Sequence, residues 1–154
     1  MHNASVISLV FTLALAVAGR LELKEQDSPR GTSMGSKITI GIGDKAFAAT
    51  LSDSPTAAAF TKLLPLSITM TELNGNEKFA RLSTNVPVQA STPASIRTGD
   101  LMLYGSNTLV LFYKSFRTTY RYTVIGRIDE PAELEVALGA GDIAVVFALD
   151  KERN

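Results

Sequence analysis

The sequence contains 154 residues, with 15 basic and 15 acidic side chains, one histidine, and neither cysteine nor tryptophan. This length suits one domain that buries its own hydrophobic core. The balanced charge argues against a general nucleic-acid-binding protein, whose domain usually carries a basic excess. The lack of cysteine excludes disulfides, thiolate nucleophiles and cysteine-ligated metal centres.

The first 18 residues have the pattern of a secretory signal peptide. Residues 6–18 form an apolar run that ends in Ala16-Val17-Ala18 and is followed by Arg20. The run is shorter than the roughly 20 residues of a membrane-spanning helix. Its small-residue ending is typical of a cleavage site, although residues 1–5 lack Lys and Arg. An uncleaved anchor and a buried N-terminal helix are the alternatives.

We therefore expect three segments: a signal peptide over residues 1–18, a polar linker over 19–35 and a folded domain over 36–154. The domain is then exported, to the periplasm or out of the cell, and has no membrane span after cleavage. A translation start at Met34 is the alternative, and it would leave the domain in the cytoplasm.

Most of the remaining chain alternates between apolar and polar residues with a period of two, which is typical of half-buried strands. Residues 109–112 are apolar at every position, so their strand is expected at the centre of the fold. Ser54 and Pro55 begin a predicted helix that ends near Pro65, and Pro131 begins a second one that ends before Gly139. Strands are predicted over residues 38–42, 47–51, 66–71, 77–82, 101–104, 108–113, 119–128 and 143–149.

Residues 83–99 are rich in Ser, Thr and Pro and are predicted to form a long loop. Loops of this length are uncommon in compact domains and are often functional. Many short strands, Gly-rich turns, two short helices and the lack of strand–helix–strand alternation together indicate a small β-barrel or sandwich.

Five segments resemble, in this order, those of a family of small, mostly bacterial cyclophilin-like domains. They are LLPL at 63–66, ELNGNEK at 72–78, GDLMLY at 99–104, LFYK at 111–114 and GRID at 126–129. The resemblance covers residues 37–149. It implies an all-β (mainly β) fold, a closed eight-stranded β-barrel with two short helices that cover its ends.

The resemblance does not imply an activity. The Phe-His-Arg and Gln-Gly-Gly-Asp-Phe segments of true cyclophilins are missing, and the only histidine is His2, in the predicted signal peptide. Without histidine the mature domain lacks the residue for a Ser-His-Asp triad or a histidine metal ligand. We therefore expect no catalytic residue, metal or cofactor, and a non-enzymatic binding module. Prolyl isomerisation of Xaa-Pro peptides is the alternative.

Two other patterns have structural interpretations. Residues 41–46 match G-x-G-x-x-A but precede a strand rather than a helix, which favours a hairpin turn over a dinucleotide site. Asp129, Glu130 and Glu133 lie at a predicted helix start, where carboxylates interact favourably with the helix dipole. A calcium site is the alternative there.

The window over residues 101–128 contains all four tyrosines, with four basic and no acidic side chains. One interpretation is an aromatic groove with cationic rims that binds an anionic small molecule or a peptide. The other is an alternation of core aromatic residues with a solvated basic face. Nucleic acid is not an expected partner, because the total charge is neutral and the domain is predicted to be exported.

Under the first interpretation, the candidate ligand-binding residues are Arg81, Tyr104, Tyr113 and Arg127. The two arginines would hold a carboxylate or carbonyl through their forked donors, and the two tyrosines would supply flat contact area and hydroxyl groups. Glu77 and Lys78 lie beside the Asn-Gly turn and are expected on the same rim of this cleft.

Overall fold

The computed structural model describes residues 35–151. The predicted signal peptide, all but the last residue of the linker, and Met34 lie outside the described residues. The described strands are β1 Lys37–Ile42, β2 Lys45–Leu51, β3 Leu66–Leu73, β4 Glu77–Arg81, β5 Asp100–Tyr104, β6 Thr108–Phe112, β7 Thr123–Ile128 and β8 Ile143–Leu149. The described helices are α1 Pro55–Thr61 and α2 Leu134–Leu138. Among the described residues, no helix is long and apolar enough to cross a membrane.

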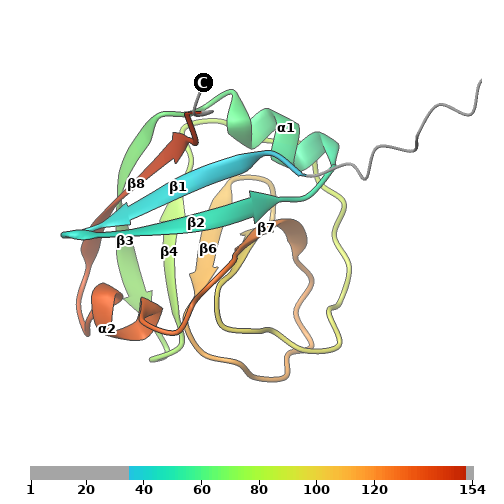
Figure 1. The fold of residues 1–154 in the computed structure, drawn as a ribbon. Coiled ribbons are helices and arrows are strands. Elements are labelled where there is room, and N and C mark those ends of the chain that lie inside the picture. The colour runs from blue at the N-terminus through green and yellow to red at the C-terminus, as the bar shows by residue number, and fades with distance from the viewer. Residues whose placement is uncertain (1–34, 152–154) are drawn as a thin grey trace, which may run out of the picture. The chain divides into compact units, whose positions relative to one another are not determined.

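The strands form a closed antiparallel barrel in the order β1-β2-β7-β5-β6-β4-β3-β8, and pairing of β8 with β1 closes it (Figure 1). The predicted fold class is therefore confirmed. Hairpins join β1 to β2, β3 to β4 and β5 to β6, as the turn residues predict. Closure leaves the wall with two faces, an interior face and an outer face.

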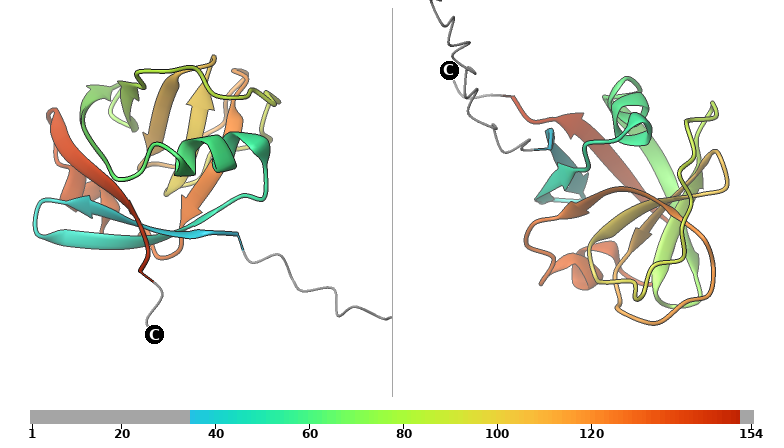
Figure 2. Two further views of the ribbon diagram at one scale, coloured as in Figure 1. Left: turned by 90° about the horizontal axis from the view of Figure 1, so that it is seen from above. Right: turned by 90° about the vertical axis from the view of Figure 1, so that its right-hand side faces the viewer.

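The two helices lie at opposite ends of the barrel (Figure 1). Viewed from above, α1 crosses one open end (Figure 2, left). The Ser54 hydroxyl accepts a hydrogen bond from the Ala57 backbone N–H at 3.1 Å, which is the predicted cap. Below it, the Phe60 ring packs edge-on against Phe147 of β8, with 5.6 Å between centroids. The helix thus seals one end of the interior core.

The predicted strand bounds lie within two residues of the observed ones except at β7, and α1 ends at Thr61 rather than near Pro65. Residues 119–122 were expected to be strand, but β7 begins at Thr123, and Tyr122 forms only an isolated bridge with Ser91. A second bridge joins Ile96 to Phe116, so the 83–99 loop and the segment after β6 pair with each other across the outer face. The helix expected from Pro131 begins at Leu134, because a turn precedes it.

The wall formed by β4, β5 and β6 is buried on its interior face and on part of its outer face. The interior core receives Leu109 and Leu111 of β6, while Val110 and Phe112 join a second apolar cluster on the outer face. The outer cluster is completed by residues of the wall and of the paired loops, namely Ile96, Met102 and Tyr122 with Phe79 and Phe116 packed against it. Residues 109–112 are all buried, which confirms their predicted central position. The outer cluster is covered by loops.

A buried lysine holds the segment after α2 against the barrel. Lys78 of β4 is fully buried on the interior face, and its Nζ donates to the carboxylate of Glu72 on β3 at 2.5 Å. The same group donates to the carbonyl oxygens of Gly139 and Gly141 at 2.8 and 2.6 Å. The Tyr113 ring centroid lies 5.6 Å from Nζ, and the Tyr113 hydroxyl donates to Glu72 at 2.7 Å. One ammonium thus joins two strands and the α2 end of the barrel.

Replacing Lys78 by Met is expected to lower the free energy of unfolding by about 3 kcal/mol, because it leaves the partly buried Glu72 Oε2 and two carbonyl oxygens without their donor. Urea unfolding followed by far-UV circular dichroism measures this loss. Lys45→Met is the matched control, since the Lys45 ammonium pairs with Glu133 in solvent and its removal is expected to cost much less. Equal losses in the two variants would contradict the role of Lys78.

Candidate binding groove

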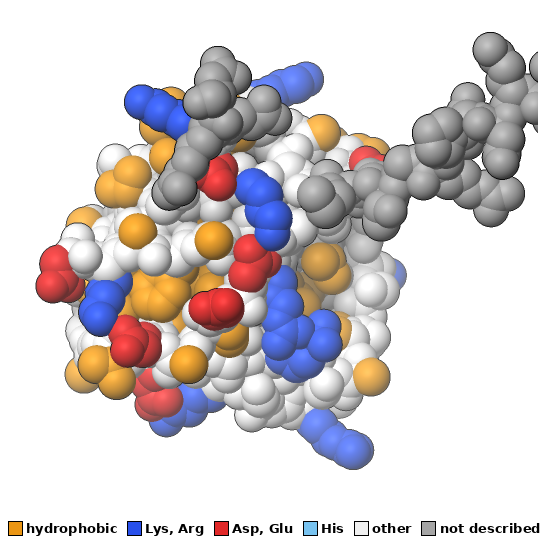
Figure 3. All heavy atoms as spheres, in the orientation of Figure 1, with side chains coloured by type: hydrophobic (Ala, Val, Ile, Leu, Met, Phe, Trp, Pro, Cys, Tyr) orange, Lys and Arg blue, Asp and Glu red, His pale blue; other side chains and the backbone are white. Residues whose placement is uncertain are grey.

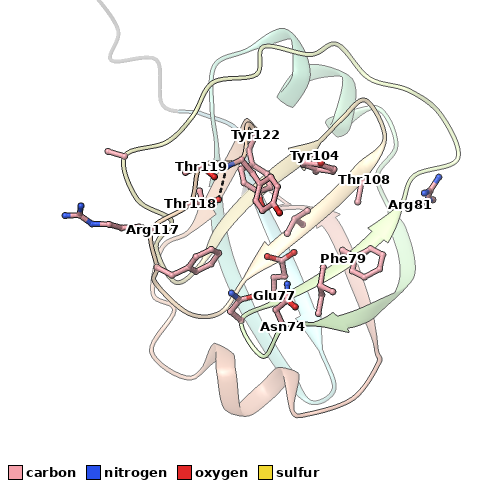
Figure 4. A pocket seen from close by; sticks show the side chains of 16 residues that line it. Asn74, Glu77, Phe79, Arg81, Tyr104, Thr108, Arg117, Thr118, Thr119 and Tyr122 are labelled. Carbon is pink, nitrogen blue, oxygen red and sulfur yellow. Dashed lines mark hydrogen bonds between the residues drawn. The ribbon is translucent and has the colours of Figure 1, made fainter.

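A groove of about 840 Å³ lies on the outer face of the barrel wall (Figure 4). Its floor consists of outward-facing side chains of β3 to β6, and its walls come from the paired loops. The floor is contiguous because Glu77, Phe79 and Arg81 of β4 are in register with Phe112, Val110 and Thr108 of β6. The groove is lined by Leu73, Asn74, Asn76, Glu77, Phe79, Arg81, Ala94, Tyr104, Thr108, Val110, Phe116, Arg117, Thr118, Thr119, Tyr120 and Tyr122.

Aromatic rings form a continuous row along one side of the groove. Tyr104 lies 6.3 Å from Tyr120 and 5.7 Å from Tyr122, and Tyr122 lies 5.4 Å from the buried Phe112 beneath it (centroid distances). Burial raises the pKa of Tyr122 to about 12, and the nearby charge of Glu77 acts in the same direction. Tyr104 is 48% exposed and Tyr120 is 63% exposed, so flat aromatic surface faces the open groove.

Glu77 lies at the bottom of this groove. Its side chain points from β4 into the groove (Figure 4), and the residue is only 8% exposed. Burial, together with the charge of Glu72, raises the pKa of the Glu77 carboxyl above its ordinary value. Lys78, expected on the same rim, instead faces the barrel interior, because successive residues of a strand point to opposite faces. Glu77 and Lys78 therefore lie on opposite sides of the barrel wall.

The structure places two of the four predicted ligand-binding residues, Arg81 and Tyr104, on the lining of this groove, and the other two outside it. Tyr113 follows Leu109 and Leu111 in the alternation, so it faces the interior and the Glu72 carboxylate. Arg127 is paired with Asp100, at the opposite end of β5 from Tyr104. The four residues therefore do not share one concavity.

The sequence places Glu77 on the rim of the predicted cleft but does not single out Phe79, Phe116 or Tyr122 as site residues. The alternation along β4 contains the information for Phe79. Glu77 and Phe79 point to the same face as Arg81, whereas Lys78 points to the other face. The tyrosine-rich window did contain Tyr120 and Tyr122. Tyr120 and Tyr122 line the groove because residues 113–122 pair with the 83–99 loop. No local sequence pattern predicts this pairing.

Two of the three acidic residues before α2, Asp129 and Glu133, form ion pairs. On the face seen in Figure 3, acidic and basic side chains are interspersed. Lys37 of β1 donates to Asp129 at 2.8 Å, and Lys45 of β2 donates to Glu133 at 2.7 Å. Glu133 makes no side-chain cap at the start of α2. Among residues 35–151 there is no group of three or more His, Cys, Asp or Glu side chains that could hold a metal ion.

Replacing Glu77 by Gln is expected to stabilise the fold relative to the wild type as the pH rises from about 4 to about 7. Because the folded pKa of Glu77 is raised, its contribution to stability is present below the ordinary pKa and is lost as the pH rises through the folded pKa. Gln does not titrate. Urea unfolding at several pH values measures the difference between the two proteins.

The exposed Glu130 provides the control, since Glu130→Gln is expected to show no such trend with pH. A difference between wild type and Glu77→Gln that stays constant over this pH range would contradict the burial of an ionisable carboxyl in the groove.

Comparison with known proteins relates the chain to a family. The model of the cyclophilin-like family matches residues 40–148. The solution structure of the hypothetical protein AF2241 from Archaeoglobus fulgidus is similar, with a TM-score of 0.57 and 19% identity, over 78% of this chain and 99% of that chain. A search among curated proteins finds no match. Since the family match extends over more than half of the chain, and the resemblance drawn from the sequence agrees with it, the protein belongs to the cyclophilin-like family.

Proposed function

We propose that this domain binds a small molecule or a short peptide in the groove over β4, β5 and β6. The observation that supports it is the row of tyrosines along a concave, partly apolar surface, with Tyr104 and Tyr120 left about half or more exposed. Exposed aromatic side chains gathered in a concavity are typical of binding sites. The volume of the groove falls within the range of small-molecule sites.

Prolyl isomerisation is a second candidate function. Arg81 favours it, because this residue lines the groove near Phe79 and its guanidinium has no partner among the described residues. A protease-coupled assay on Xaa-Pro peptides distinguishes the two functions. The binding proposal predicts rates equal to uncatalysed isomerisation at micromolar protein. An acceleration that Arg81→Ala abolishes would favour the isomerase instead.

The binding proposal is tested with benzyl alcohol, a neutral aromatic probe, by ligand-observed NMR saturation transfer. We expect the full chain to bind it and the Tyr104→Ala/Tyr120→Ala double variant to bind about tenfold more weakly, because two ring contacts are lost. Val136→Ala is the control, since Val136 is 86% exposed on α2 and does not line the groove. Equal binding by the double variant would contradict the proposal, as would a wild type that binds neither this probe nor a charged analogue of it.

We also propose that the domain is exported. The apolar run over residues 6–18 and its Ala16-Val17-Ala18 ending support this. N-terminal sequencing of protein purified from its native source is expected to begin at Gly19. A first residue at or next to Met34 would instead support the cytoplasmic alternative.

A further inference from the structure

The Glu77 carboxylate has no hydrogen-bond or ion-pair partner among the described residues, although the residue is more than nine-tenths buried. It points into the groove from the strand that forms the floor (Figure 4). A buried carboxylate is costly unless a donor or a positive charge compensates it. Lys78, the adjacent cation, faces the interior and is held by Glu72. Compensation for Glu77 therefore has to come from the groove side.

A second unpartnered acceptor lies next to Glu77 in the chain. Asn76 lines the same groove, and its side-chain oxygen Oδ1 is buried without a hydrogen-bond partner. An ionised carboxylate accepts hydrogen bonds only, and the amide oxygen of Asn is likewise an acceptor. Two acceptors without donors favour a ligand group that carries several N–H donors.

The surroundings of these acceptors favour a positively charged donor group. Aromatic rings of Phe79, Phe116 and Tyr122 line the groove around Glu77, and the faces of such rings attract cations. The charge of Glu77 also raises the pKa of Tyr122, as expected for two groups that lie near each other. A carboxylate surrounded by aromatic rings suits an organic ammonium better than a neutral hydroxyl group.

The two arginines of the groove lie away from Glu77. Arg81 and Arg117 are at opposite ends of the groove, and the Arg117 side chain points away from it (Figure 4). Both residues are exposed, and neither has an ion-pair partner among the described residues. The floor of the groove is therefore negative while its ends are positive, which differs from the purely cationic cleft expected from the sequence.

We propose that the groove recognises its ligand through a protonated amine, whose N–H groups donate to the Glu77 carboxylate and to Asn76 Oδ1 while the aromatic rings pack around it. The proposal rests on the function proposed above and names the chemical group that the site selects. A free amine and the lysine side chain of a peptide share this chemistry.

The test uses three probes of similar size that differ in charge: benzylammonium, benzyl alcohol and benzoate. The Kd of each is measured near neutral pH by chemical-shift titration of the ¹⁵N-labelled full chain. We expect benzylammonium to bind about tenfold more tightly than benzyl alcohol, because its hydrogen bonds to Glu77 are charge-assisted. Benzoate is expected to bind more weakly than benzylammonium.

In Glu77→Gln, the ratio of the two Kd values is expected to fall to about one, since the negative charge is removed while the shape is kept. Glu130→Gln is the matched control, because Glu130 is exposed and does not line the groove. The dispersion of the amide spectrum reports whether each variant is folded. The comparison of the three probes on the wild type requires no variant and tests the proposal by itself.

Equal Kd values for benzylammonium and benzyl alcohol in the wild type would overturn the proposal and leave groove binding intact. Tighter binding of benzoate would also overturn it and assign recognition to Arg81 and Arg117. Failure of all three probes to bind would overturn the proposed function itself, and the amine proposal with it.

The two sources of the amine are separated with a blocked Ala-Lys-Ala peptide and its norleucine counterpart. If lysine of a peptide is the source, the lysine peptide is expected to bind more tightly than both the norleucine peptide and benzylammonium. If a free amine is the source, benzylammonium is expected to bind more tightly than either peptide. Either result supports amine recognition, whereas tighter binding of the norleucine peptide than of both amines contradicts it.

Discussion

Strand β4 buries two adjacent charges on opposite faces of the barrel wall, the Glu77 carboxylate on the outer face and the Lys78 ammonium in the interior. The Lys78 ammonium compensates for its burial through Glu72 and two carbonyls after α2, so the interior is closed and fully paired. Glu77, one residue earlier, has no such partner among the described residues. The two faces therefore differ: the interior face holds a paired ammonium, and the outer face holds an unpaired carboxylate in the groove where we propose that a ligand binds.

The outer face depends on loops for its cover. Val110 and Phe112 project from the same strand that supplies Leu109 and Leu111 to the interior, so the outer side also needs apolar packing. The bridges Ser91–Tyr122 and Ile96–Phe116 hold two long loops over part of this surface. The part they leave open is the groove. The aromatic wall of the groove thus consists of residues of the outer apolar cluster and of the loops that cover it.

The fold was predictable because it follows from local sequence patterns. Alternation places Ile38, Ile40 and Ile42 inside the barrel as expected, and the cap at Ser54 positions α1. The site was less predictable, because it depends on the phase of each strand and on pairing between loops. Tyr113 and Tyr104 are both aromatic and near in sequence, yet they lie on opposite faces of the wall. The phase of β5 and β6 determines that outcome, and the sequence does not reveal it because both strands are apolar on both faces.

The most direct test of this account is a crystal structure of the full chain soaked with benzylammonium at saturating concentration. The account predicts the ring between the tyrosines and Phe79, with the nitrogen about 2.7–3.2 Å from the Glu77 carboxylate and within hydrogen-bond distance of Asn76 Oδ1. A ring bound with its ammonium directed to solvent or to a rim, or a groove without the probe, would contradict it.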